Sequence, residues 1–98
     1  MSATVLFRRV ARSEFDEATD WYERRRSGLG PRFVMAVQGV LDRIVNQPDF
    51  YPLVEGDVRE ARVRRFPFCV YYRRDASQIL VLAVFHTSRD PSGWLRRV

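Results

Sequence analysis

The sequence predicts an α+β fold in which a twisted, mainly antiparallel sheet packs against an α-helical hairpin on one face. Three observations lead to this prediction. Apolar residues recur at helical spacing between residues 14 and 47, apolar strand-like runs follow between residues 58 and 85, and 98 residues suffice for only one core. The expected element order is β-α-α-β-β-β, and residues 1–98 are expected to form a single domain.

The first two elements are expected to be a short strand and a helix. The apolar run Val5–Val10 predicts the strand. Ser13 is a residue type that caps helix N-termini, so the first helix is expected over about residues 14–26. Gly28 marks its end, because glycine is common just after a helix C-terminus. The apolar face of this helix carries Ala11, Phe15, Ala18 and Tyr22.

A second helix is expected from Pro31, which suits a first helical turn, to about Gln47, because Pro48 cannot continue it. Gly39 lies in mid-helix at a cost of about 1 kcal/mol relative to alanine. We therefore expect it to let the first helix approach closely. The short link between the helices makes them an antiparallel hairpin. The apolar stripe of the second helix consists of Phe33, Val37, Val40, Leu41 and Ile44.

The second half of the chain is predicted to supply the rest of the sheet. Residues 48–57 are expected to be a loop, since they hold two prolines and a glycine. Three strands are then expected, over about residues 58–66, 68–74 and 79–85. Residues 79–85 are apolar on both faces, which predicts a central strand covered on two sides. The hairpin covers only one side, so the C-terminal tail or a partner is expected to cover the other.

The net charge of +5 is concentrated in the second half of the chain. All 17 basic residues are arginine, which a GC-rich coding bias would explain without any functional meaning. That bias does not explain where the charge lies. Residues 1–57 hold 8 arginines against 9 acidic residues, a net of −1, whereas residues 58–98 hold 9 against 3, a net of +6. This placement predicts an acidic or phosphate-bearing partner for the second half.

Six arginines are candidate ligands for such a partner. Strand alternation puts Ala61 and Val63 toward the core and Arg62 and Arg64 on the opposite face. Guanidinium groups bind carboxylates and phosphates through paired hydrogen bonds, and crowded like charges cost stability unless something binds them. The alternative is a plain solvated basic face. The six candidates are Arg59, Arg62, Arg64, Arg65, Arg73 and Arg89.

His86 is the only histidine and directly follows the last predicted strand. Its imidazole titrates near neutral pH and could act as an acid or base. The alternative, favoured because no second candidate base is nearby in sequence, is a structural imidazole. Arg89 and Asp90 are expected to fix a chain turn, with Asp90 paired to Arg89 or to a sheet arginine. Cys69 lies in an apolar strand, which predicts a buried, inert thiol. One cysteine excludes an internal disulfide and a multi-thiolate zinc site, and no metal or cofactor is expected.

Targeting signals are not evident in the sequence. No run reaches the ~18 apolar residues of a membrane span. The first residues, Met1–Thr4, lack the basic-then-apolar pattern of a signal peptide. These observations lead us to expect a cytoplasmic protein that does not contact membranes.

A series of motifs along the chain resembles a known family. They are Glu14–Ala18 with Trp21 and Tyr22, Pro48, Phe68–Arg73, and Val84–His86 with Arg89 and Asp90. In this order and spacing they resemble the RelE/ParE superfamily, and more closely its ParE-like members. These are toxins of bacterial type II toxin–antitoxin modules, also called plasmid stabilisation proteins. The resemblance spans nearly the whole chain and implies the same β-α-α-β-β-β architecture.

The resemblance also implies partners. A cognate acidic antitoxin would wrap its partly disordered tail around the toxin and cover the exposed sheet, folding as it binds. Operator DNA would be contacted only indirectly, through the antitoxin. ParE-like members poison DNA gyrase by binding it, whereas RelE-like members cut mRNA in the ribosome. Under the RelE-like alternative, the catalytic residues would be His86 as acid or base and Arg62, Arg64 and Arg73 around the phosphate.

The chain departs from the RelE-like pattern at three places. That pattern implies an arginine where Cys69 stands, a basic residue where Glu60 stands, and a tyrosine near the C-terminus, whereas no tyrosine follows Tyr72. We therefore expect a ParE-like toxin that binds gyrase rather than an enzyme. A ribosome-dependent mRNA endonuclease is the alternative, and a binding module that has lost toxicity is a third possibility.

Overall fold

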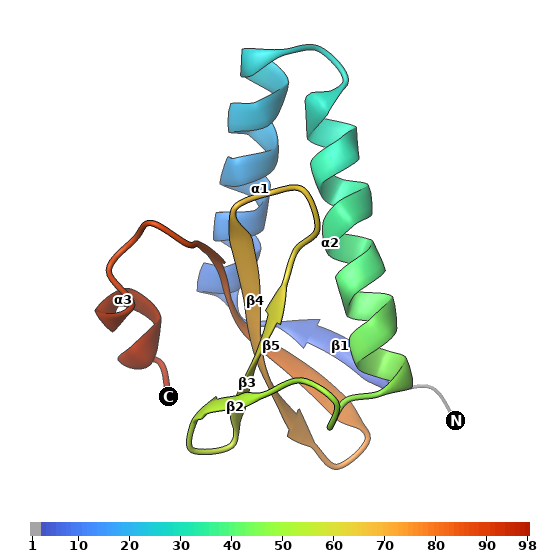
Figure 1. Cartoon of the computed structure of the whole chain (residues 1–98), viewed down its shortest axis with the longest axis vertical. Coiled ribbons are helices and arrows are strands. Elements are labelled where there is room, and N and C mark those ends of the chain that lie inside the picture. The colour runs from blue at the N-terminus through green and yellow to red at the C-terminus, as the bar shows by residue number, and fades with distance from the viewer. Residues whose placement is uncertain (1–2) are drawn as a thin grey trace.

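The computed structural model describes residues 3–98 and consists of one open five-stranded sheet with a helical hairpin on one face (Figure 1). The elements are β1 (Thr4–Phe7), α1 (Arg9–Arg25), α2 (Leu29–Asn46), β2 (Leu53–Glu55), β3 (Val58–Arg62), β4 (Phe68–Asp75), β5 (Gln78–His86) and α3 (Ser92–Leu95). The predicted α+β class is confirmed. The first two residues of the predicted domain, Met1 and Ser2, lie outside the described residues.

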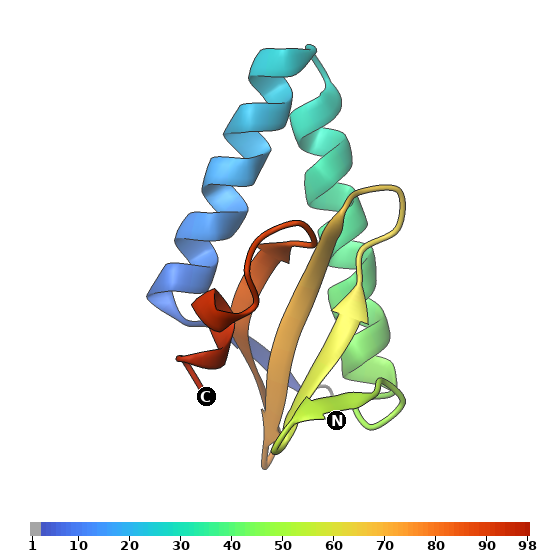
Figure 2. The same cartoon turned by 60° about the vertical axis from the view of Figure 1, so that its left-hand side comes forward.

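The sheet has the strand order β1-β5-β4-β3-β2. Only the β1–β5 pair is parallel, and the other three pairs are antiparallel, so the mainly antiparallel prediction is confirmed. The tip of the helical hairpin projects beyond the sheet, and the loop between β3 and β4 lies alongside α2 (Figures 1 and 2). No helix within residues 3–98 is long and apolar enough to cross a bilayer.

The sheet is buried on both faces, and a different part of the chain covers each. The hairpin face holds the larger core, which includes the predicted α2 stripe residues Phe33, Val37, Val40 and Ile44, all at 0% exposure. The opposite face holds a second cluster, in which Trp94 of α3 packs with Val58, Cys69, Tyr71, Leu82 and Phe85. The C-terminal tail is therefore the second cover of β5. Of the two covers expected for this face, the C-terminal tail or a partner, the structure shows the tail, with Trp94 on the sheet.

A stacking contact and a hydrogen bond hold the C-terminal tail and the end of α2 to the sheet. The Trp94 ring lies parallel to that of Tyr71, with centroids 4.0 Å apart. On the other face, the buried Tyr72 hydroxyl donates a 2.6 Å hydrogen bond to the carbonyl of Pro48, just after α2. Burial raises the pKa of Tyr72 to about 12, so its hydroxyl keeps its proton at neutral pH. These contacts attach the C-terminal tail and the segment after α2 to β4.

The first helix begins earlier than the sequence predicts. It starts at Arg9 rather than near residue 14, so Ser13 lies inside α1 and is not its N-cap. The strand correspondingly ends at Phe7. Ala11 is fully buried, so the apolar face of α1 extends to the N-terminal end of the helix. The apolar run Val5–Val10 alone assigns residues 9 and 10 to a strand instead.

The close approach of the two helices occurs at Gly30, so the prediction that Gly39 allows it is wrong. A Cβ on Gly30 would lie 3.0 Å from the Cβ of Glu23, whereas a Cβ on Gly39 would meet only Arg43, at 3.7 Å. The Glu23 carboxylate also accepts hydrogen bonds from the backbone amides of Gly28 and Gly30, at 3.0 to 3.1 Å. A side chain of α1 thus satisfies free amides at the start of α2 and fixes the hairpin.

The edge of the sheet also differs from prediction. Residues 53–55, expected as loop, form the short strand β2, which pairs with β3 through a bulge. All three of its residues are exposed, so no burial pattern identifies them. At the other end, β3 stops at Arg62 instead of Phe66, because the chain turns at Arg65 with a φ of 68°.

Candidate functional site

The six predicted binding arginines divide into two sets. Arg59, Arg73 and Arg89 each contact an acidic or backbone group of the same chain. Arg59 donates a 2.6 Å hydrogen bond to the carbonyl of Tyr51, and Arg73 forms a 3.2 Å ion pair with Asp57. These contacts tie the β2–β3 end of the sheet together, so the charge of these two arginines is largely committed to the fold.

The other three arginines lie in or beside the β3–β4 loop (residues 63–67). Arg62, Arg64 and Arg65 are exposed, and within residues 3–98 none of them forms an ion pair. Hydrogen bonds from Val63 N to Phe68 O (2.9 Å) and from Phe68 N to Phe66 O (2.8 Å) close the loop. This closure holds Arg65 at its positive φ, which a non-glycine residue adopts only at a cost. The loop therefore presents its guanidinium groups to solvent.

One side of this loop borders an open hollow of about 1160 Å³, which we name the arginine groove. It lies between the C-terminal end of α2, the following loop and β3. Its lining comprises Arg43, Asn46, Gln47, Phe50, Tyr51, Pro52, Glu60, Arg62, Val63, Arg64 and Arg65. The Phe50 ring is 73% exposed and meets the Tyr51 ring edge-on, at 5.3 Å between centroids. The groove thus combines four guanidinium groups with an exposed aromatic face.

Glu60 is the one acidic residue in the lining of the arginine groove. Its Oε2 accepts a 2.7 Å hydrogen bond from the hydroxyl of Tyr71. Burial, together with this hydrogen bond, raises the pKa of Tyr71, so the hydroxyl remains a donor at neutral pH. Within residues 3–98 the Glu60 carboxylate forms no ion pair with an arginine, and the positive charge of the groove is not internally neutralised.

The other side of the loop borders a second hollow, of about 900 Å³, which we name the apolar hollow. It is lined by Tyr22, Leu29, Arg32, Met35, Ala36, Arg64, Arg65, Phe66 and Pro67. Met35 is 71% exposed, so its apolar side chain is accessible to a ligand in this hollow. Arg64 and Arg65 border both hollows, so a ligand in either one would meet them.

His86 lies at a different edge of the sheet, which we name the His86 rim. It is the last residue of β5 and pairs with Phe68, whose ring it meets edge-on at 5.1 Å. Its Nδ1 accepts a 3.0 Å hydrogen bond from the backbone amide of Ser88, and the Ser88 hydroxyl lies 2.7 Å from the same nitrogen. One imidazole nitrogen is thereby used to hold the turn after β5, as the structural interpretation expects.

The structure does not bring together the four residues of the nuclease alternative. His86 borders a hollow with Glu14 and Arg89, whereas Arg62 and Arg64 border the arginine groove. Arg73 pairs with Val58, four residues along β3 from Arg62, or about 13 Å at the rise of a strand.

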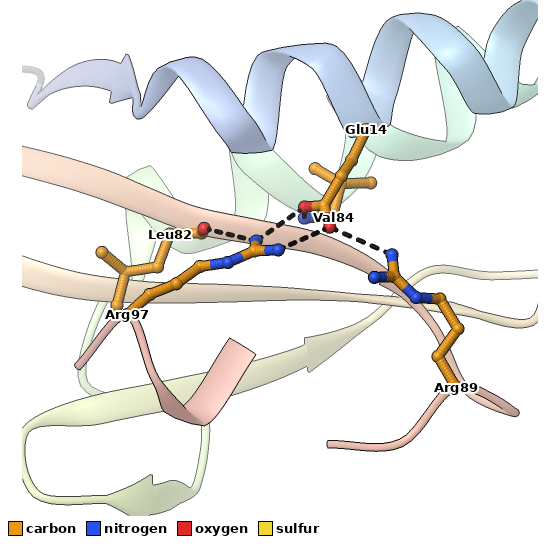
Figure 3. A network of polar contacts seen from close by, with 5 residues as sticks. All are labelled: Glu14, Leu82, Val84, Arg89 and Arg97. Carbon is orange, nitrogen blue, oxygen red and sulfur yellow. Dashed lines mark hydrogen bonds and ion pairs between the residues drawn. The ribbon is translucent and has the colours of Figure 1, made fainter. Parts of the chain in front are cut away.

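The His86 rim contains an ion cluster that connects three distant segments (Figure 3). The Glu14 carboxylate of α1 receives two 2.9 Å hydrogen bonds from Arg97 and one 3.1 Å bond from Arg89. The same carboxylate accepts the backbone amide of Val84 at 3.1 Å, and Arg97 also donates to the carbonyl of Leu82. Glu14 is 11% and Arg97 14% exposed, so this cluster fastens the C-terminal tail across β5.

Sequence reasoning missed Glu14 and Arg97 as a pair because 83 residues separate them. One signal was present. Glu14 falls three residues after Ala11 and four before Ala18, which puts a carboxylate on the apolar face of α1. An acidic residue at such a position needs a partner.

Asp90 and Cys69 are also assigned roles by the sequence. Asp90 does fix the turn, by accepting a 3.0 Å hydrogen bond from the backbone amide of Ser92. Within residues 3–98 it forms no ion pair, so its expected pairing with Arg89 or with a sheet arginine is wrong. Backbone hydrogen bonding lowers the pKa of Asp90. Cys69 is buried at 5% exposure, as predicted, and burial raises the pKa of its thiol; that the thiol is inert stays a prediction. Within residues 3–98, no three His, Cys, Asp or Glu side chains gather as metal ligands.

Comparisons with known proteins agree with this fold. Residues 5–91 match the family model described as the ParE toxin of the type II toxin–antitoxin system parDE. A chain from the chromosomal ParDE TA system of P. aeruginosa superposes with a TM-score of 0.64 at 18% identity, over 88% of this chain and 97% of that chain, which shows a shared fold. No curated protein matches the sequence. Because the family model spans most of the 98 residues, the chain belongs to the family of ParE toxins of type II toxin–antitoxin systems.

Proposed function

We propose that this chain inhibits growth by binding DNA gyrase and that a cognate antitoxin neutralises it. The observation that carries the proposal is the β3–β4 loop, where Arg62, Arg64 and Arg65 have no acidic partner within residues 3–98. Exposed, uncompensated charge beside two hollows suits a surface that binds another macromolecule. Membership in the ParE family supports the same function.

The antitoxin segment is proposed to dock in the apolar hollow. Apolar side chains of the segment would pack on Met35 and Phe66, and its carboxylates would pair with Arg32, Arg64 and Arg65. Charge complementarity selects an acidic partner, and the exposed apolar lining selects one with apolar anchors. The remaining predicted ligands, Arg59, Arg73 and Arg89, would contribute less because they already pair within the chain.

A supercoiling assay with purified gyrase tests the target. The chain at micromolar concentration should block supercoiling, and equimolar antitoxin should restore it. Unchanged supercoiling together with growth arrest on expression would show that the target of the toxin is not gyrase. The control for surface charge is a double substitution of Arg9 and Arg24 by alanine, because both are exposed on α1 and form no ion pair within residues 3–98.

The mRNA endonuclease remains the alternative and has its own test. It requires His86 and Arg73 to act on the same phosphate as Arg62, although they border different parts of the sheet. In vitro translation with mapped mRNA ends should therefore show no cutting by this chain. Cutting that disappears in His86→Ala would establish the alternative.

A further inference from the structure

We propose that the arginine groove is a binding site for single-stranded nucleic acid. The inference goes beyond gyrase inhibition and does not depend on it. Two features carry it: a group of guanidinium groups with no acidic partner, and an exposed aromatic ring at the same hollow. Together they match the two parts of a nucleotide, its phosphate and its planar base.

Four arginines of the groove would contact the phosphates: Arg43, Arg62, Arg64 and Arg65. All four border the groove, and none forms an ion pair within residues 3–98. Four like charges around one hollow repel each other until an anion binds between them. The lone carboxylate of the lining, that of Glu60, instead accepts the Tyr71 hydroxyl at 2.7 Å. The groove therefore offers several phosphate contacts along its length.

Phe50, which also lines the groove, would stack on a base. Its ring is 73% exposed, although burial of such a ring normally stabilises a fold. Tyr51 supports the ring edge-on at 5.3 Å, and Tyr51 in turn meets the fully buried Tyr72 at 6.4 Å. These aromatic contacts anchor Phe50 to the buried core, and its 73% exposure leaves the side chain accessible to a base. The bases of a duplex are stacked on one another and offer no free face to Phe50, so a single strand fits better.

The shape and chemistry of the two hollows decide between nucleic acid and an acidic peptide. The groove, at about 1160 Å³, exceeds the volume of a typical small-molecule site and suits a short stretch of polymer. A peptide with apolar anchors fits the apolar hollow on the other side of the loop, where Met35 is 71% exposed. Because Arg64 and Arg65 border both hollows, the two ligands would compete for them.

Fluorescence anisotropy with an oligothymidylate of about 12 nucleotides tests the proposal. Four phosphate contacts predict a log–log salt slope of about −2.8, equivalent to about a 50-fold loss of affinity between about 50 and 200 mM salt. The pair Arg62→Ala and Arg64→Ala should halve this slope. The matched pair Arg9→Ala and Arg24→Ala, which removes the same charge from α1, should leave it unchanged. If both pairs of substitutions changed the salt slope equally, the proposed site would be refuted, because the attraction of the oligonucleotide would then depend on net charge alone.

A second variant separates base stacking from simple polyanion attraction. Phe50→Ala should weaken the oligonucleotide about tenfold while leaving heparin, a polyanion without bases, bound as before. Equal affinity of Phe50→Ala and the parent chain for the oligonucleotide would overturn the stacking assignment. Tighter binding of polyglutamate than of the oligonucleotide at equal charge would make the groove a peptide site and refute the proposal. Since Phe50 is exposed, this variant should keep the parent's thermal unfolding midpoint, which checks that it is folded.

Discussion

At the His86 rim, Arg89 and Arg97 share the carboxylate of Glu14, whereas at the arginine groove Arg62 and Arg64 have no acidic partner within residues 3–98. Both regions contain arginines from the strongly basic second half of the chain. At the rim the charge is compensated and partly buried, so it holds the tail in place. At the groove the charge is solvated and uncompensated, so it is available to a partner. Local pairing, not net charge, distinguishes an arginine committed to the fold from one that is available to a partner.

The largest expected effect comes from removing the side chain that the rim holds in place. Trp94→Ala deletes the ring stacked on Tyr71 and exposes the second core cluster. We expect a loss of about 4 kcal/mol in the free energy of unfolding, measured by urea denaturation. Leu95→Ala is the control, since Leu95 is 37% exposed and should cost well under half as much. Equal losses would mean that the tail does not cover the sheet in solution.

The next effect tests the ion cluster itself. Glu14→Ala leaves Arg97 and the amide of Val84 without their acceptor, and should cost about 3 kcal/mol in unfolding free energy. Asp16→Ala removes a carboxylate of the same helix whose pair with Arg12 is 59% exposed on both sides. It should cost no more than about 0.5 kcal/mol. A similar cost for both would remove the distinction between the rim and an ordinary surface pair.

The groove arginines should show the opposite behaviour. The pair Arg64→Ala and Arg65→Ala should change the unfolding free energy by less than about 0.5 kcal/mol, because neither side chain has a partner to lose within residues 3–98. The same pair should weaken the antitoxin complex at least about tenfold, measured by titration calorimetry. Unaltered affinity would exclude the loop from that interface.

The smallest effect concerns Glu60, the acidic residue in the lining of the arginine groove. Tyr71→Phe removes the hydroxyl that holds the Glu60 carboxylate, which then becomes free to pair with Arg62. Anion binding in the groove should weaken by about 0.5 kcal/mol, or about twofold. Restoration by a second substitution, Glu60→Gln, would confirm the cause. No change in either variant would show that Glu60 does not influence the groove.

The sequence was sufficient for the architecture but not for the long-range contacts of the site. Helical spacing on Phe33, Val37 and Ile44 correctly places α2 on the core, because that pattern depends only on neighbouring residues. The short strand β2 was missed because its residues are exposed and held only by pairing with β3.

The division of the arginines illustrates the same limit. Charge counting located them in the second half of the chain, and the loop residues among them are indeed exposed. It did not separate Arg89, which binds Glu14 from 75 residues away, from Arg64, which has no acidic partner within residues 3–98. That distinction depends on which acids the folded chain brings near, and sequence spacing does not contain it.

Growth arrest on induced expression tests most directly whether the β3–β4 loop is the partner surface of this toxin. The double variant Arg64→Ala and Arg65→Ala is compared with the matched pair Arg9→Ala and Arg24→Ala, at equal protein level and equal unfolding free energy. The contrast between the two regions predicts that the loop variant lets cells grow, whereas the α1 variant arrests growth as the parent chain does. Full arrest by the folded loop variant would contradict it.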